Sequence, residues 1–293
     1  MNDHNALLAG VPRSGTTLTC ELLNLLPDAV ALDEPMKVRF LTGRDQVEDG
    51  GTDQDRNRPR DRGLICDSIE AFLDESRRSI AESRTAFSQQ VDGRVFGGKF
   101  SDDYGEGDLR TKLATKGEIT IDKDLPVDFL LVIKHTGAFT ALLEDLVGRF
   151  RVYATVRNPL SILSSWQTVP FPGKDGHHPV AEEIDAGLAR ELAAIEDRID
   201  RQIRLVGWFF ERYRDLLPSE NVIRYESIVE SGGGALAGIT PSAAALGEPL
   251  ESRNRASVYD QEGMREIGER LLRSDGAYWD FYARESVTEL LEA

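Results

Sequence analysis

The sequence predicts an α/β protein in which a parallel β-sheet carries helices on both faces. Two apolar runs rich in β-branched residues, 129–133 and 152–156, are typical of strands buried on both faces of such a sheet. Each run is followed by a segment in which apolar residues repeat at helical spacing, at 138–147 and at 160–166. This alternation of strands and helices favours a doubly wound sheet.

The N-terminal segment adds two strands and a glycine loop. A short apolar strand at 6–9 leads into a loop with two glycines at 10–15, and helical spacing follows over 16–26. A second short strand at 29–32 leads to Glu34. Strand, glycine loop and helix in this order are a common phosphate-binding arrangement.

The rest of the chain predicts more helices and two segments without a regular pattern. The predicted helices span 65–87, 182–217 and 262–291, and another short strand spans 221–225. The segment 43–63 is nearly all charged or small, and we expect a mobile loop there. The segment 93–124 is polar and glycine-rich, and its pattern assigns no element.

Size and composition limit the organisation of the chain. Its length predicts one domain, residues 1–293, with loop insertions. No apolar run approaches the roughly 18 to 20 residues of a membrane span. The N-terminus lacks the features of a signal peptide, and the chain has only two cysteines. Both observations predict a cytoplasmic protein. The net charge of -16 opposes nucleic-acid binding, so any anion must be captured where Arg, Lys and backbone N–H groups are concentrated.

The loop at 10–17 predicts a phosphate site. Its glycines have the separation found in a GxxxxGK[ST] loop, but Thr16 stands where that loop has its lysine. Inward N–H groups and the positive end of the next helix favour an anion, and Arg13 can supply the missing charge. An ordinary turn is the alternative. The residues expected to hold the anion are Pro12, Arg13, Ser14, Gly15, Thr16 and Thr17.

A second anion site is predicted where the 152–156 strand ends. Arg157 follows this strand, and its planar guanidinium can make two charge-assisted hydrogen bonds to a phosphate. Ser165 follows eight residues later and can add a hydroxyl donor. A surface ion pair of the arginine is the alternative interpretation.

Together the two sites resemble the PAPS-dependent sulfotransferase family, where PAPS is 3′-phosphoadenosine 5′-phosphosulfate. The segment Gly10 to Leu18 resembles that family's loop for the 5′-phosphosulfate, and Arg157 with Ser165 resembles its pair for the 3′-phosphate. The resemblance covers residues 5 to about 40 and 128 to about 230. It implies a P-loop NTPase-like fold and transfer of the sulfuryl group from PAPS to an acceptor hydroxyl or amine, without a metal ion.

The resemblance also implies catalytic residues. Glu34 resembles the general base of the tyrosylprotein and glycan sulfotransferase branches, and a carboxylate at a strand end can take the acceptor's proton. Lys134 matches the position of a lysine that stabilises charge on the leaving phosphate. His135 is the alternative base, because its ordinary pKa suits proton transfer. Tyr225 resembles a tyrosine that packs near the adenine.

Two other functions stay open at this point. A P-loop kinase would use Mg-ATP, with Asp33 and Glu34 as metal ligands, although the loop lysine is missing. A nucleotide-binding protein without catalysis would need only the anion sites. The acceptor, a small molecule or a glycan, and the oligomeric state do not follow from the sequence, because 43–63, 93–124 and 171–179 are its least patterned segments.

Overall fold

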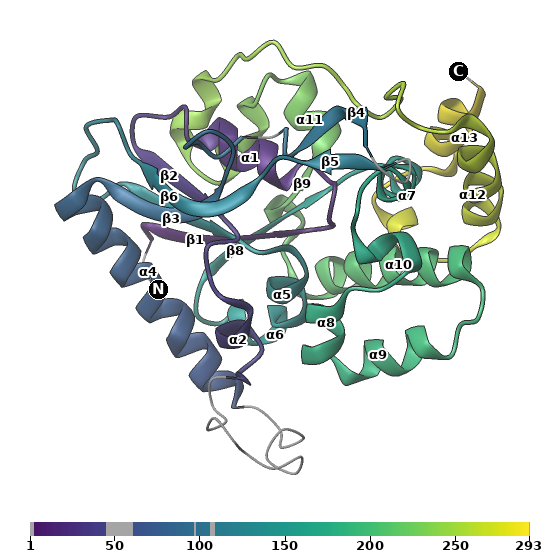
Figure 1. Cartoon of the computed structure of the whole chain (residues 1–293), viewed down its shortest axis with the longest axis horizontal. Helices are drawn as coiled ribbons and strands as arrows, with labels where there is room; N and C mark the ends of the chain where they lie inside the picture. Colours follow the sequence, from purple (N-terminus) through teal and green to yellow (C-terminus); the bar gives the residue numbers. More distant parts are fainter. Residues whose placement is uncertain (1–2, 45–60, 97, 106–108, 293) are drawn as a thin grey trace.

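A parallel sheet of five strands forms the centre of the protein (Figure 1). The computed structural model describes residues 3–44, 61–96, 98–105 and 109–292. In spatial order the strands are β2 (Ala29–Asp33), β7 (Leu130–Lys134), β1 (Asn5–Gly10), β8 (Arg151–Val156) and β9 (Val222–Arg224). Helices lie on both sides of this sheet, so the predicted α/β class is confirmed.

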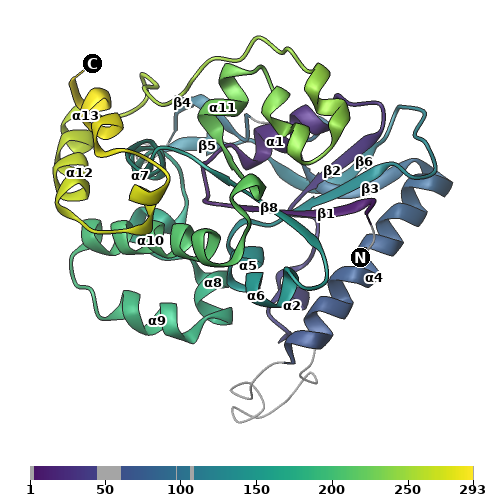
Figure 2. The ribbon, with the colours of Figure 1, turned by 180° about the vertical axis from the view of Figure 1, so that it is seen from behind.

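The helices form separate groups on the two faces of the sheet (Figures 1 and 2). One face carries α1 (Thr16–Leu23) and α11 (Tyr225–Glu230), and the opposite face carries α5 (Thr136–Ala141) and α6 (Leu143–Leu146). The other α-helices of the described residues are α2 (Val38–Leu41), α4 (Arg62–Ser83), α7 (Pro159–Gln167), α8 (Pro179–Ile184), α9 (Ala186–Ala193), α10 (Arg198–Leu216), α12 (Gln261–Arg273) and α13 (Arg284–Glu292). None of the helices in the described part of the chain has the length and apolar character to cross a bilayer.

The register of the sheet brings the ends of four strands to one edge. Leu8 of β1 and Asp33 of β2 both pair with Lys134 of β7, and Gly10 pairs with Thr155 of β8. All residues of β1, β2 and β7 are buried, as expected of strands that are apolar except at one end. Since parallel strands end at the same edge, the loops after β1, β2, β7 and β8 open side by side, where ligands bind in sheets of this kind.

The prediction of one long helix over 182–217 is wrong, because three helices occupy this segment. The helix α8 ends at Ile184, α9 begins after Asp185, and α10 begins after Asp197. Each aspartate has extended backbone and accepts hydrogen bonds of 2.8 to 3.1 Å from two N–H groups of the helix that follows. Aspartate is a favoured N-cap, so each one starts a new helix while the apolar spacing continues.

The helix predicted over 65–87 is also too long. Arg84 adopts the left-handed conformation, with φ 55°, and ends α4. The chain continues as β3 (Thr85–Gln90), in which the Phe87 side chain is exposed. Three other predicted elements also differ from the structure. The helix predicted over 16–26 ends at Leu23, and Tyr225 begins α11 instead of ending a strand. The helix predicted over 262–291 is two helices, α12 and α13.

The unassigned segment 93–124 forms strands outside the central sheet. The strand β6 (Thr115–Thr120) pairs antiparallel with β3, and β4 (Phe100–Tyr104) pairs antiparallel with β5 (Arg110–Lys112). We call β3 to β6 the β-arm. Of the predicted mobile loop 43–63, residues 45–60 lie outside the described residues, and Arg62 and Gly63 already belong to α4.

Substituting Gly10 should disturb the loop that follows β1. Gly10 has φ 148°, and a Cβ there would lie 2.5 Å from Cγ2 of Thr16 and 2.6 Å from Oγ1 of Thr155. We expect Gly10→Ala to lower the free energy of unfolding by roughly 1–3 kcal/mol, measured by urea denaturation. The control is Gly148→Ala, where a Cβ meets nothing within 4 Å. Equal losses in both variants would contradict this prediction.

Candidate active site

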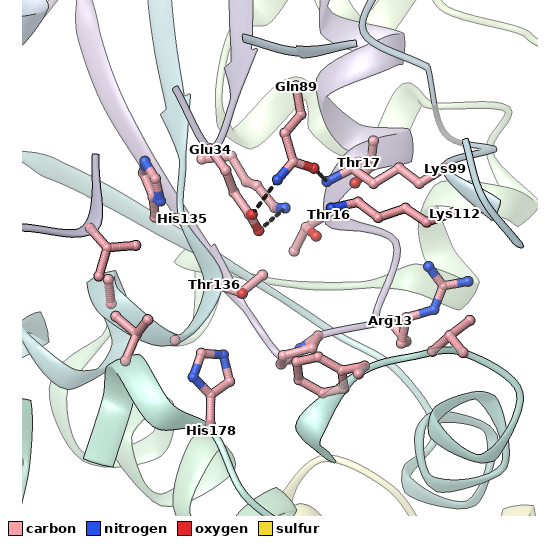
Figure 3. A pocket seen from close by; sticks show the side chains of 18 of the residues that line it. Arg13, Thr16, Thr17, Glu34, Gln89, Lys99, Lys112, His135, Thr136 and His178 are labelled. Carbon is pink, nitrogen blue, oxygen red and sulfur yellow. Dashed lines mark hydrogen bonds and ion pairs between the residues drawn. The ribbon is translucent and has the colours of Figure 1, made fainter. Parts of the chain in front are cut away.

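The predicted catalytic and anion-binding residues gather at the carboxyl edge of the sheet. The glycine loop follows β1, Glu34 follows β2, Lys134 ends β7 and Arg157 follows β8. A cavity of about 270 Å³ opens at this edge (Figure 3). The predicted residues that line it are Pro12, Arg13, Thr16, Thr17, Glu34, Lys134 and His135.

The glycine loop is held by contacts to β8 and α7. The Ser14 hydroxyl donates to the carbonyl of Thr155 at 2.8 Å, so it points into the sheet and away from the cavity. The indole N–H of Trp166 donates to the carbonyl of Pro12 at 2.9 Å. Of the three hydroxyls that the sequence assigned to the anion, those of Thr16 and Thr17 belong to residues that line the cavity.

Arg13 connects the glycine loop to the second predicted anion site. Its Nε donates to Oγ of Ser165 at 3.0 Å, and its guanidinium carbon lies 5.0 Å from the centroid of the Phe100 ring. Burial lowers the pKa of Arg13 to about 10, and the charges of Arg157 and Arg253 act in the same direction. Arg13 is therefore still a cation at neutral pH, in a place where positive charge is concentrated.

Arg157 is buried, and protein acceptors occupy its guanidinium. Its Nε donates to Oδ1 of Asn254 at 2.7 Å, Nη1 to the carbonyl of Arg13 at 3.1 Å, and Nη2 to the carbonyl of Arg253. The Tyr259 hydroxyl lies 3.4 Å from Nη2. Burial raises the pKa of the Tyr259 hydroxyl, but the charge of Arg157 and a hydrogen bond with Ser165 outweigh this effect, and the pKa lies below its ordinary value. Residues 253–259 therefore cover Arg157 and Ser165, the pair that was predicted to bind a phosphate.

Tyr225 packs between the two predicted anion sites. A Cβ on Gly15, which has φ 89°, would lie 2.7 Å from Cδ2 of the Tyr225 ring. The Arg157 guanidinium lies 4.6 Å from the centroid of the same ring, and the Tyr225 hydroxyl accepts the N–H of Arg253 at 3.0 Å. These contacts hold the loop and the arginine together, while a role beside an adenine stays a prediction.

Glu34 is held at the cavity by two donors. Lys134 Nζ donates to Oε1 at 2.9 Å and Gln89 Nε2 donates to Oε2 at 2.8 Å. The backbone of Glu34 is left-handed, with φ 46°, and its N–H donates to the Lys134 carbonyl at 2.8 Å. Burial raises the pKa of the Glu34 carboxyl, but Lys134 and Lys99 lower it to well below its ordinary value. Glu34 is therefore an ionised acceptor at neutral pH.

A second carboxylate lies fully buried beside Glu34. Asp33 Oδ1 is 2.8 Å from Lys134 Nζ, and Oδ2 is 2.5 Å from Lys99 Nζ. Lys99 also donates to Oε1 of Gln89 at 2.8 Å, as Figure 3 shows. Burial raises the pKa of Asp33, and the two lysines lower it below its ordinary value. The five side chains form one connected network that keeps both carboxylates ionised.

His135 is placed less well than Glu34 to take a proton. Its Nε2 accepts the backbone N–H of Met36 at 3.2 Å, so the lone pair at that nitrogen is engaged. Burial lowers the pKa of His135 to about 3, and the imidazole is neutral at pH 7. Between the two bases that the sequence left open, the geometry favours Glu34.

Several residues of the cavity were not found by sequence reasoning. Those with polar side chains are Gln89, Lys99, Lys112, Lys116, Thr136 and His178. Four of the six come from the β-arm or its connections, where the sequence showed a helix or no pattern. The signal that could have found the lysines was their concentration in 93–124, since cations stand out in an acidic chain.

Acid should destabilise the protein partly through His135. The folded pKa of about 3 lies below the ordinary 6.5, so the unfolded chain binds this proton first. The stability linked to His135 is complete above about pH 6.5 and is lost as the pH falls toward 3. Urea unfolding should show a loss of roughly 1–2 kcal/mol between pH 7 and pH 5 that is absent in His135→Gln. The same pH dependence in both proteins would refute the prediction.

Comparison with known proteins assigns no family to this chain. No protein-family model matches it, and no curated protein matches its sequence. The residues at the edge of the sheet, and the chemistry that they can perform, are therefore the evidence for its function.

Proposed function

We propose that the protein transfers a sulfuryl group from PAPS to an acceptor hydroxyl or amine. The observation that carries the proposal is the direct contact between residues of the two predicted anion sites. Arg13 Nε donates to Oγ of Ser165 at 3.0 Å, and Arg157 Nη1 donates to the Arg13 carbonyl at 3.1 Å. Adjacent sites of this kind suit a nucleotide with phosphates at its 5′ and 3′ positions, as in PAPS, whereas ATP has only the 5′ chain.

The residues around the glycine loop fit such a donor. The loop N–H groups, Arg13 and the hydroxyls of Thr16 and Thr17 would bind the 5′-phosphosulfate. Arg157 and Ser165 would bind the 3′-phosphate, which would replace the acceptors that residues 253–259 now provide. The positive charges of Arg13 and Arg157, which lie close enough to affect each other, favour an anion with several phosphates in this region.

Glu34 and Lys134 would supply the chemistry. The acceptor oxygen or nitrogen attacks sulfur, and its new bond forms as the bond between sulfur and the bridging oxygen breaks. The acceptor proton passes to Glu34, and adenosine 3′,5′-bisphosphate leaves with the electron pair. Lys134, 2.9 Å from the Glu34 carboxylate, can stabilise the charge that develops on the leaving oxygen. In-line positioning by the cavity contributes the rest.

The partners of Asp33 disfavour the alternative of a magnesium-dependent kinase. Both carboxylate oxygens of Asp33 are paired with lysine ammonium groups, at 2.8 and 2.5 Å. Glu34 likewise accepts from Lys134 and Gln89. These hydrogen-bond donors occupy the oxygen atoms with which the carboxylates would bind a metal ion, so the arrangement suits a donor that needs no magnesium.

Nucleotide binding tests the choice of donor. Adenosine 3′,5′-bisphosphate should bind in calorimetric titrations, and ADP with Mg²⁺ should bind much more weakly, because it has no group for Arg157. We expect Arg157→Met to weaken bisphosphate binding by about 10- to 100-fold, and the exposed Arg265→Met to leave it unchanged. Binding of ADP and Mg²⁺ without binding of the bisphosphate would exclude the proposed function.

Catalysis should depend on the Glu34 carboxylate more than binding does. We expect Glu34→Gln to lower the rate of bisphosphate release from PAPS, assayed with a panel of hydroxyl acceptors, by roughly 10²- to 10⁴-fold. Its affinity for the bisphosphate should change by less than about twofold. Glu118→Gln, an exposed site in β6, is the matched control. An unchanged rate in Glu34→Gln would remove Glu34 from the mechanism.

A further inference from the structure

Two lysines of the cavity lie outside the network around Glu34. Lys112 ends β5, Lys116 lies in β6, and both side chains line the cavity. The backbone N–H groups of Leu113 and Ala114 donate to the carbonyl of Lys99 at 2.8 and 3.3 Å, which holds the connection between the two strands. The β-arm thus presents both ammonium groups to the same space.

Neither lysine pairs with a carboxylate of the residues that the structure describes. Within the described residues, Lys112 Nζ has no hydrogen bond or ion pair, and Lys116 Nζ has one hydrogen bond, of 3.4 Å to the carbonyl of Met36. Burial lowers the pKa of Lys116, and Glu34 is the carboxylate that opposes this most strongly. Lys116 therefore lies within electrostatic reach of the proposed base.

The cavity holds more positive charge than the donor's reacting end would balance. Its lining carries five cations and one carboxylate, and the buried Asp33 adds a second carboxylate. The phosphosulfate of PAPS brings about two negative charges, which leaves an excess of about one positive charge. Lys112 and Lys116 are exposed to solvent in the free protein, which tolerates this excess, and their charge favours a second anionic group that enters the cavity beside them.

Another part of the lining is apolar. Its side chains are those of Val38, Leu41, Ala138, Phe171 and Val180. His178 lies across the cavity from Lys112 (Figure 3). The N–H of Ala181 donates to His178 Nδ1 at 3.4 Å, so Nε2 carries the proton of the neutral ring. This wall suits the body of an organic molecule and offers it one hydrogen-bond donor.

We propose that the acceptor is amphipathic and carries an oxyanion that Lys116 binds together with Lys112. The oxyanion is a carboxylate, phosphate or sulfate, the body of the acceptor lies on the apolar wall, and its nucleophilic group meets Glu34. This inference rests on the proposed sulfuryl transfer. A neutral acceptor of the same shape would leave this excess charge without a partner, and would bind more weakly.

Matched probes test the inference on the full-length protein saturated with adenosine 3′,5′-bisphosphate. The probes are 4-hydroxyphenylacetate, 4-hydroxybenzylphosphonate and the neutral 4-hydroxyphenylacetamide, and ligand-observed NMR measures their affinities. At least one anionic probe should bind about tenfold more tightly than the amide. A preference for the phosphonate or for the carboxylate identifies the kind of oxyanion.

Variants assign the preference to the two lysines. Lys116→Ala should remove most of the preference, and Lys116→Arg, which keeps the charge, should retain it. The control is Lys37→Ala, an exposed lysine near Met36 that does not line the cavity. The inference is wrong if no anionic probe binds more tightly than the amide, or if the preference persists in the double variant Lys112→Ala with Lys116→Ala.

Bisphosphate affinity separates this inference from the proposed function. If the bisphosphate binds but the anionic probes show no preference, the inference about the acceptor fails alone. If Lys116→Ala weakens bisphosphate binding about tenfold instead, this lysine serves the donor and the inference also fails. If wild-type protein does not bind the bisphosphate, the proposed function fails.

Discussion

The ammonium group of Lys134 is the contact on which the site depends. Its side chain is 3% exposed, and its Nζ lies 2.8 Å from Asp33 and 2.9 Å from Glu34. Breaking a buried pair of this kind typically costs about 3–5 kcal/mol, because the partner charge stays buried without compensation. Lys134 belongs to β7, between β1 and β2, so one group joins the pairing of the strands to the chemistry at their ends.

The β-arm is attached to the sheet through the same network. Lys99 pairs with Asp33, and the backbone N–H of Asp33 donates to the hydroxyl of Ser88 in β3 at 2.9 Å. Gln89, the next residue, donates to Glu34. A segment that lies far from Glu34 in the sequence therefore sets the orientation and the charge of its carboxylate. The lysines of the arm reach the cavity because of this attachment.

Left-handed backbone occurs at two positions where function is proposed. Arg13 has φ 76° and Glu34 has φ 46°, and both follow buried strands. Such conformations cost energy in residues with a side chain and persist where neighbouring contacts hold them. Here the indole of Trp166 binds the loop beside Arg13, and the carbonyl of Lys134 binds the N–H of Glu34. Both side chains are thereby directed before any ligand arrives.

Local pattern in the sequence was sufficient for the α/β class, the glycine loop and the residues at the strand ends. Buried strands have continuous apolar sequences, and parallel strands end at one edge, so Glu34, Lys134 and Arg157 follow from short-range information. Sulfuryl transfer and the roles of these residues stay predictions. The breaks at Asp185 and Asp197 depended on capping hydrogen bonds that apolar spacing does not report.

Only the tertiary structure decided how the cavity is completed. Lys112 and Lys116 lie on short, largely exposed strands, and Lys99 directly precedes another, so no apolar period marks these positions. Met36 donates a hydrogen bond to His135, and residues 253–259 accept hydrogen bonds from Arg157. Both interactions join segments that are distant in the sequence. Sequence alone determined which groups stand at the ends of the strands, because burial is a local pattern. Long-range packing decided which hydrogen-bond and ion-pair partners those groups have. These partners set the charge state of each group and determine whether its polar atoms are available to a ligand.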